Sequence, residues 1–402
     1  MASTSPARRV AHRVLVRVFD EGAYADRAFA AEAAELDSRD RAFAQRAAYG
    51  AIQRVRTLDH ALQTIGGRST ADLDVPVRAA LRLGAYELGF LDGVPARASV
   101  NEAVELVRAS GAGRATGLVN AVLRRVAERI RPLLANLPEG SPAESALKHS
   151  YPDWIAETWW REWGAEEALG LMRAQNEPPE TAYRVIGTGE ARVVDRIDSD
   201  AVEQGRVWPQ SRGSQLAGHA VGAQAGDRVL DLCAAPGGKT TQLAERAAEV
   251  VAVEVHAGRA RELEQAVRRL GLENVTVVNA DACDLPPELT GFDRVLVDAP
   301  CSGLGVLASR PDLRWRAEPL PELQLELLRV AAERVRPAGS VTYSVCTIAA
   351  AENEDVVDAV GLDVEPLTDL WPEFAHPHRP EFLLTLPHKH ETSGFFVARL
   401  RP

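Results

Sequence analysis

The feature that most constrains the fold is a change in the spacing of apolar residues near residue 226. Beyond this point, Val- and Leu-rich stretches such as "DRVLDLCAA" and "DRVLVDAP" alternate with amphipathic stretches such as "GRARELEQAVRRLG". Near-continuous apolar strands that alternate with helices are typical of a parallel sheet covered on both faces. Residues 216–402 are therefore predicted to form a doubly wound, Rossmann-like α/β domain.

The N-terminal part of the chain shows helical spacing instead. Val10, Val14 and Val18 share one face of a helix that Ser5 and Pro6 can start. Further helices are predicted between Gly, Pro and Asp breaks, over 38–64, 75–91, 98–110 and 113–131. We therefore predict an all-helical domain over 1–132, followed over 133–215 by a linker rich in Pro, Gly and Ser and a small mixed α/β module.

The distribution of charge points to the helical domain as the part that meets a nucleic acid. The chain has a net charge of -11, yet residues 1–132 hold 20 arginines against 15 aspartates and glutamates. Arg9, Arg13 and Arg17 form a stripe along the first helix. Such a stripe is most often a solvated face, but the local positive charge favours contact with RNA phosphates. Further candidates for this contact are Arg54, Arg56, Arg124 and Arg125.

Composition also narrows the cellular setting. The chain lacks an apolar stretch near the roughly 20 residues that span a bilayer, and its first residues do not read as a secretion signal. We therefore expect a cytoplasmic protein without a membrane partner. Its four cysteines include no Cys-x-x-Cys pair, which argues against a disulfide framework and a zinc site, so no metal is expected.

The carboxyl ends of the predicted strands supply a cofactor site. The first strand runs into "DLCAAPGGKT", whose spacing matches neither the dinucleotide nor the triphosphate glycine motif. Glu254, Asp281 and Asp298 end the next three strands, and a carboxylate at the second can hold ribose hydroxyls. This combination suits S-adenosylmethionine, which needs no phosphate cradle. Besides these three carboxylates, the predicted cofactor-binding residues are Cys233, Ala234, Ala235, Pro236, Gly237, Gly238 and Lys239.

Two cysteines follow strands that are predicted to be neighbours, Cys301 in "VDAPCSGLG" and Cys346 in "YSVCT". A single cysteine is usually a small buried apolar side chain. A thiolate can, however, add to carbon 6 of a pyrimidine and make carbon 5 reactive toward a methyl donor. Lys239, one of only three lysines, is a candidate for stabilising such a thiolate. The residues alone do not decide which cysteine is the nucleophile.

Taken together, "DLCAAPGGKT", "VDAPCSG" and "YSVCT" followed by "EN" resemble the motifs of the Sun family of RNA 5-methylcytosine methyltransferases. The helical part resembles the NusB-like RNA-binding domain that precedes the catalytic domain in the branch acting on small-subunit ribosomal RNA. The resemblance implies that Cys346 is the nucleophile, that Cys301 helps to release the product, and that Asp298 contacts the base. It also implies that Gly394 and Phe395 lie near the site.

The resemblance implies methylation of carbon 5 of a cytosine in 16S ribosomal RNA, either free or in an immature particle, with no obligate protein partner evident. Ser211 stands where the family commonly has an acidic residue. Two alternatives remain open: the same chemistry on transfer RNA or another RNA, and a non-catalytic RNA-binding factor in transcription or ribosome assembly. An intact cofactor loop and both cysteines argue against the second.

Overall fold

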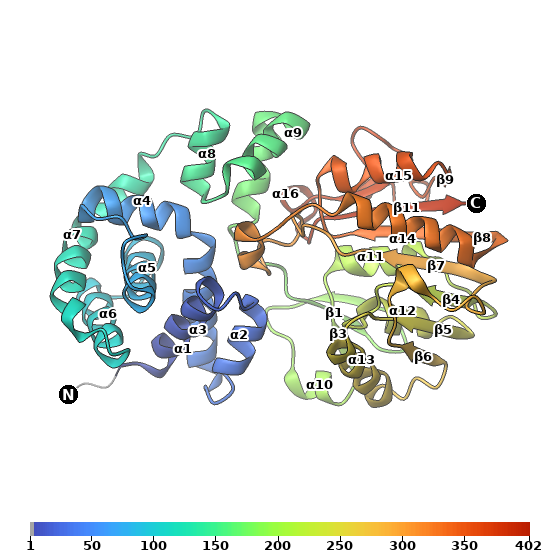
Figure 1. Cartoon of the computed structure of the whole chain (residues 1–402), viewed down its shortest axis with the longest axis horizontal. Helices are drawn as coiled ribbons and strands as arrows, with labels where there is room; N and C mark the ends of the chain where they lie inside the picture. The colour runs from blue at the N-terminus through green and yellow to red at the C-terminus, as the bar shows by residue number, and fades with distance from the viewer. Residues whose placement is uncertain (1–3) are drawn as a thin grey trace. The chain divides into compact units, whose positions relative to one another are not determined.

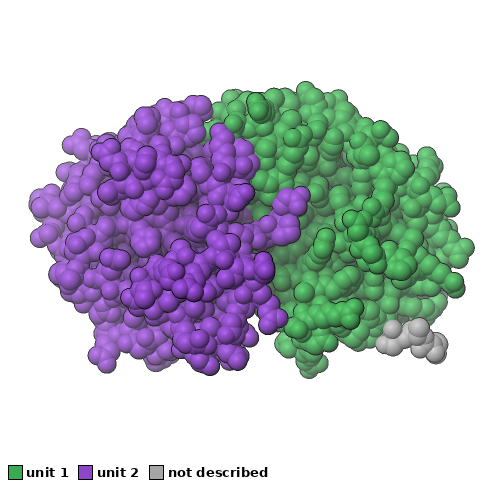
Figure 2. Space-filling view, turned by 180° about the vertical axis from the view of Figure 1, so that it is seen from behind, with its two compact units in different colours: residues 1–176, 307–316 green, residues 177–306, 317–402 purple. Residues whose placement is uncertain are grey.

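A computed structural model describes residues 4–402, which form two compact units (Figures 1 and 2). The helical unit contains the chain up to Asn176 together with Leu307–Arg316. The sheet unit contains Glu177–Val306 and Ala317–Pro402. The predicted combination of an all-helical part and an α/β part is confirmed. Division of the chain into three functional modules stays a prediction, because packing separates only these two units.

Amphipathic helices build the helical unit around one apolar core. The predicted helix over 38–64 is in fact two helices that meet at Arg54. The amides of Arg56 and Thr57 donate to the hydroxyl of Ser150, at 3.0 and 3.4 Å, which satisfies donors at the start of the second helix. The helices are α1 (Pro6–Phe19), α2 (Ala25–Glu32), α3 (Ser38–Gln53), α4 (Val55–Gly66), α5 (Val75–Phe90), α6 (Ala96–Ala109), α7 (Thr116–Ala135), α8 (Pro142–His149) and α9 (Asp153–Ala174).

The segment 307–316 belongs to the helical unit although it follows the Cys301 loop in sequence. Its short helix η3 (Pro311–Trp315) carries Arg314, whose side chain is fully buried. The Arg314 guanidinium donates to the carbonyl of Gln175 at 2.6 Å and to the side chain of Asn176 at 2.7 Å, and it stacks over the Tyr151 ring. Burial lowers the pKa of Arg314 to about 10, so the group stays charged at neutral pH. These contacts anchor the segment.

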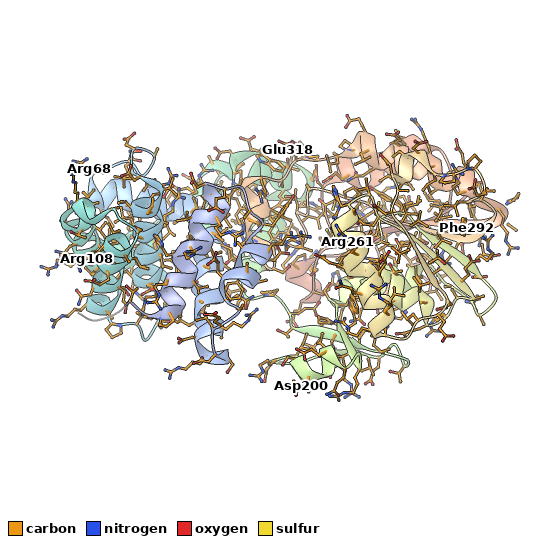
Figure 3. All side chains as sticks on the ribbon, turned by 60° about the horizontal axis from the view of Figure 1, so that its bottom comes forward. Arg68, Arg108, Asp200, Arg261, Phe292 and Glu318 are labelled. Atoms are coloured by element: carbon orange, nitrogen blue, oxygen red, sulfur yellow. The ribbon has the colours of Figure 1, made fainter. Side chains whose placement is uncertain are left out.

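The predicted basic stripe is partly neutralised by its own unit. Arg13 and Arg17 of α1 both pair with Glu32 of α2, at 2.7 and 3.2 Å. Other arginines of the helical unit are exposed as well, and Figure 3 labels two of them, Arg68 and Arg108. Contact of RNA with α1 would therefore compete with ion pairs that already exist.

The sheet unit has two sheets (Figure 1). The small one has the antiparallel order β2-β1-β3, and α10 (Ser199–Glu203) precedes its last strand. The large one has the order β10-β11-β8-β7-β4-β5-β6, with β9 beside β11. The strands are β1 (Ala182–Val185), β2 (Ala191–Val193), β3 (Val207–Pro209), β4 (Arg228–Asp231), β5 (Glu249–Val253), β6 (Val275–Val278), β7 (Phe292–Asp298), β8 (Val335–Val345), β9 (Asp363–Glu365), β10 (Leu383–Thr385) and β11 (Phe395–Arg401).

Strands β6, β5, β4, β7 and β8 run parallel, so their carboxyl ends meet at one edge of the sheet. Ligands of open α/β sheets bind at such an edge, near the point where the strand order reverses. The order reverses around β4, the strand before the glycine-containing loop. The helices of this unit after β3 are α11 (Arg212–Ala220), α12 (Gly238–Ala244), α13 (Ala257–Arg269), α14 (Pro321–Arg334), α15 (Glu354–Val360) and α16 (Pro387–His390).

Buried and exposed side chains separate as the apolar spacing requires. Phe292, which starts β7, is fully buried, whereas Arg261 on α13 is exposed (Figure 3). None of the described helices combines the length and the apolar character needed to cross a bilayer. The described residues also contain no group of three or more His, Cys, Asp or Glu side chains placed to hold a metal ion.

Candidate active site

A cavity of about 190 Å³ opens at the carboxyl ends of β4, β5 and β7. Its wall combines carboxylates with apolar side chains, which is the composition expected for a nucleoside with a cationic end and no phosphate. The lining residues are Leu232, Cys233, Ala235, Glu254, Val255, Arg259, Asp281, Ala282, Cys283, Asp298, Ala299, Pro300, Leu323 and Leu327. These residues fit S-adenosylmethionine in the type of group that they present.

The predicted cofactor loop contributes only part of its length to this wall. Cys233 and Ala235 line the cavity, whereas Ala234, Pro236, Gly237, Gly238 and Lys239 do not. Gly237 instead has a φ of 108° at the start of α12, and a Cβ there would lie 2.6 Å from the Leu263 side chain. A glycine is therefore required at this position by backbone conformation and by packing.

Glu254 follows β5 and is 4% exposed. Its Oε1 accepts from the His256 amide at 2.8 Å and pairs with Arg259 at 3.0 Å. Both contacts among the described residues use the same oxygen, so Oε2 can accept hydrogen bonds from neighbouring hydroxyls. The predicted ribose-binding carboxylate is thus held in place without its whole acceptor capacity being used.

Asp281 and two thiols complete this side of the cavity. Asp281 accepts from the amide of Cys283 at 2.9 Å and caps a short helix. Burial raises the pKa of Cys283 to about 11 and that of Cys233 well above its ordinary value. Both groups are therefore neutral thiols near pH 7, and both line the cavity.

Asp298 lines the cavity and forms an ion pair with Lys239. Its Oδ2 pairs with the Lys239 ammonium at 2.8 Å, and its Oδ1 accepts from the Ser344 hydroxyl at 3.0 Å. Lys239 also donates to Ser214 at 3.1 Å and lies 4.8 Å from the centre of the Phe395 ring. The lysine predicted to bind cofactor or activate a thiol is thus paired with a carboxylate that lines the cavity.

The two predicted catalytic thiols are in contact, with 3.4 Å between the Cys301 and Cys346 sulfur atoms. The register of the parallel pair β7 and β8 explains this, because Asp298 lies opposite Ser344 and the cysteines follow shortly after each. The segment that contains Gly394 packs against Gly305, whose amide donates to the Cys346 carbonyl at 3.0 Å. The amide of Gly394 donates to the carbonyl of Gly305 at 2.8 Å, and a Cβ on Gly305 would lie 2.1 Å from the Gly394 oxygen.

The environment of Cys301 keeps that residue protonated. The hydrogen bond with Cys346 is the largest cause that raises the pKa of Cys301 well above its ordinary range, and burial adds to it. A protonated Cys301 can donate its hydrogen to the Cys346 sulfur, an interaction that becomes stronger when the acceptor is ionised.

Asp231, at the end of β4, is buried beneath this site and is 1% exposed. Burial raises its pKa to about 7, although Thr240 donates to its Oδ2 at 2.7 Å. The folded protein therefore keeps a proton that the unfolded chain releases near pH 4. Since the folded state binds more protons in this range, stability from this group is complete below pH 4 and is lost as the pH rises through 7.

Replacing Asp231 with asparagine is expected to remove this pH dependence, because the amide stays neutral and still accepts from Thr240. Between pH 5 and pH 8 the wild type should lose roughly 1 to 3 kcal/mol more unfolding free energy than Asp231→Asn. Urea unfolding, with β4 followed by hydrogen exchange, measures the difference. Parallel pH profiles for the two proteins would contradict this assignment.

Several side chains at the site carry no sequence signal of their own. Arg259 lies in the first turn of α13 and resembles any other surface arginine. Cys283 resembles an ordinary packing residue. Ser214 and Ser344 contact Lys239 and Asp298 only because α11 and β8 are brought beside β7 and α12. Position near the end of a strand, in the following loop for Cys283 and within β8 for Ser344, is the only indication that the sequence offers.

Comparison with known proteins gives matches over both units. Residues 219–401 match the family described as 16S rRNA methyltransferase RsmB/F, and residues 5–128 match the NusB family. A probable ribosomal RNA small subunit methyltransferase B from Synechocystis is 30% identical over 98% of this chain and 99% of its own length. The ribosomal RNA small subunit methyltransferase B of Thermus thermophilus is 37% identical over 80% of this chain and 78% of its own.

Solved structures agree with these matches. The crystal structure of PH0851 has a TM-score of 0.82 and 24% identity over the full length of both chains, which shows the common fold. A methyltransferase homolog protein from Pyrococcus horikoshii has a TM-score of 0.56 and 25% identity, over 66% of this chain and 99% of its own. The expected NusB-like and methyltransferase folds are confirmed.

Proposed function

Because the chain belongs to the RsmB/F family of 16S rRNA methyltransferases, we propose that it methylates carbon 5 of a cytosine in 16S ribosomal RNA through a transient bond to Cys346. The observation that carries this proposal is the pair of thiols at 3.4 Å, beside a cavity lined by carboxylates. S-adenosylmethionine, when bound there, supplies the methyl group on a sulfonium.

Cys346 prepares the ring for methylation. Carbon 5 of cytosine is a weak nucleophile, and a thiolate that adds to carbon 6 gives it the electron density to accept a methyl group. A hydrogen bond from Cys301 stabilises this thiolate before it attacks. Asp298 meets the polar edge of the ring in this proposal, where a hydrogen bond favours addition at carbon 6; its contacts with Lys239 and Ser344 support this role because they hold the carboxylate in one orientation.

Cys301 acts after methyl transfer, when a base must take the proton from carbon 5. The electron pair of the broken bond between carbon 5 and hydrogen then forms the double bond between carbons 5 and 6, and the bond from carbon 6 to the Cys346 sulfur breaks. The main cause of the raised pKa of Cys301 is Cys346 itself. Once that sulfur is bonded to carbon, it no longer bears a charge, so Cys301 loses its proton more readily at the step that needs a base.

The proposal is tested by incubating the purified protein with tritiated S-adenosylmethionine and either free 16S RNA, assembled small subunits or transfer RNA. We expect label in free 16S RNA, recovered as 5-methylcytidine at one position. Unstacking a base costs a few kcal/mol, so a finished subunit should be a poorer substrate. Label only in transfer RNA would support the alternative substrate. Failure to bind S-adenosylmethionine in calorimetry would instead support a non-catalytic RNA-binding factor.

A further inference from the structure

One buried carboxylate beside the thiols is used by none of the steps above. Glu352 is fully buried in the short helix η4 (Ala350–Glu352). Its oxygens accept from the amide of Ser302 at 3.0 Å, the amide of Leu320 at 3.1 Å and the side-chain amide of Gln324 at 2.9 Å. The Ser302 hydroxyl also donates to it. All these donors are uncharged, and they come from two segments, the loop after Cys301 and the start of α14.

The first of these segments carries Cys301, and Glu352 itself lies on the segment that follows Cys346. Ser302 directly follows one catalytic cysteine and Thr347 directly follows the other. Their hydroxyl oxygens are 3.0 Å apart, so a hydrogen bond joins the two loops next to the thiols. Gln324 donates to the carbonyl of Pro300 at 2.9 Å as well as to Glu352, which fixes the other side of the first cysteine. Glu352 thus lies at the centre of a network that surrounds both loops.

We propose that Glu352 is a positioning residue that sets the separation of the two thiols. This inference rests on the proposed function, in which one sulfur bonds to the base and the other must then reach the proton of carbon 5. Both steps depend on the distance between the sulfur atoms, and misplacement by about 1 Å can cost about 100-fold in rate. A carboxylate suits this place because it accepts from every neighbour, whereas an amide would turn a donor toward at least one of them.

The direct test is Glu352→Gln, which keeps the shape of the side chain and removes one acceptor oxygen. We expect kcat to fall by about 100-fold. The dissociation constant for S-adenosylmethionine and the KM for RNA should change by less than about threefold, since Glu352 is fully buried and does not line the cavity. Glu354→Gln is the matched control. Glu354 lies two residues further and is also largely buried, but its partner is His376 at 2.5 Å, a residue that belongs to neither thiol loop. Its kcat should match the wild type.

A second measurement needs no methyl transfer. Dibromobimane alkylates two nearby thiolates, with loss of two bromides, and becomes fluorescent only when both ends have reacted. The wild type should form this bridge. Cys346→Ala measures the background fluorescence from the other cysteines, and its signal should be much lower. Glu352→Gln should form the bridge at least about tenfold more slowly, because the thiols no longer face one another. Reduced bridging in a protein whose wild type methylates no RNA would support the positioning role while contradicting the proposed function.

Two results would overturn the inference. The first is wild-type kcat and bridging in Glu352→Gln. The second is a loss of thermal stability and cofactor binding that accounts for the whole loss of activity, since this would mean a purely folding role. If Glu352→Gln does not fold, Thr347→Val decides, because it removes the hydroxyl that meets Ser302 at nearly constant volume. Slower bridging by about threefold or more would support the inference, and unchanged bridging would contradict it.

Discussion

Replacing Cys346 with alanine is expected to lower methyl transfer by at least about 1000-fold, because the reaction loses the nucleophile that activates carbon 5. Binding of S-adenosylmethionine should persist in this variant. The cavity is lined by Glu254, Asp281 and Asp298 but not by Cys346, so the dissociation constant for S-adenosylmethionine should stay near that of the wild type. Single-turnover transfer to 16S RNA and calorimetry measure the two quantities separately.

RNA that contains 5-fluorocytosine gives the same prediction a structural readout. The fluorine at carbon 5 cannot leave as a cation, so the enzyme stays bonded to carbon 6 after methylation. The wild type should form a band on a denaturing gel that contains both protein and RNA. Cys346→Ala should form none. Full turnover in this variant, or an unchanged covalent band, would contradict the proposed role of the sulfur.

Replacing Cys301 with alanine is expected to have the second largest effect, and of a different kind. Turnover should fall by about 100-fold or more because the base that removes the proton is lost. The bond between the Cys346 sulfur and carbon 6 can still form. The variant should therefore accumulate a covalent complex even with ordinary RNA, for which the wild type releases its product. A denaturing gel after incubation with S-adenosylmethionine detects this complex.

The double variant provides the control for this experiment. Cys301→Ala combined with Cys346→Ala should form no covalent complex, and its activity should be no lower than that of Cys346→Ala. Residues that act in sequence on one intermediate are expected to show such non-additive losses. Rapid release of product by the Cys301→Ala variant would show that another group removes the proton.

Local patterns predicted much of the site because the chemistry is concentrated at strand ends. Glu254, Asp281 and Asp298 were assigned from their places after apolar runs, and all three line the cavity. The prediction of one helix over 38–64 was wrong, because the helix is interrupted at Arg54. The amide of Arg56 after this break donates to Ser150, which is 94 residues further along the chain. Lys239 was expected at the cofactor, and its amine pairs with Asp298, a residue of the cavity wall that is 59 residues further along the chain.

The sequence by itself determined the two kinds of architecture, the strand-end positions of the acidic residues and the presence of two cysteines in neighbouring loops. These follow from local periodicity, since apolar spacing selects helix or strand and turn residues end each element. Only the tertiary structure decided which groups touch: the sulfur atoms at 3.4 Å, the lysine on Asp298, and Glu352 between both loops. Such contacts depend on strand register and loop closure, which are properties of the packed chain rather than of any single segment.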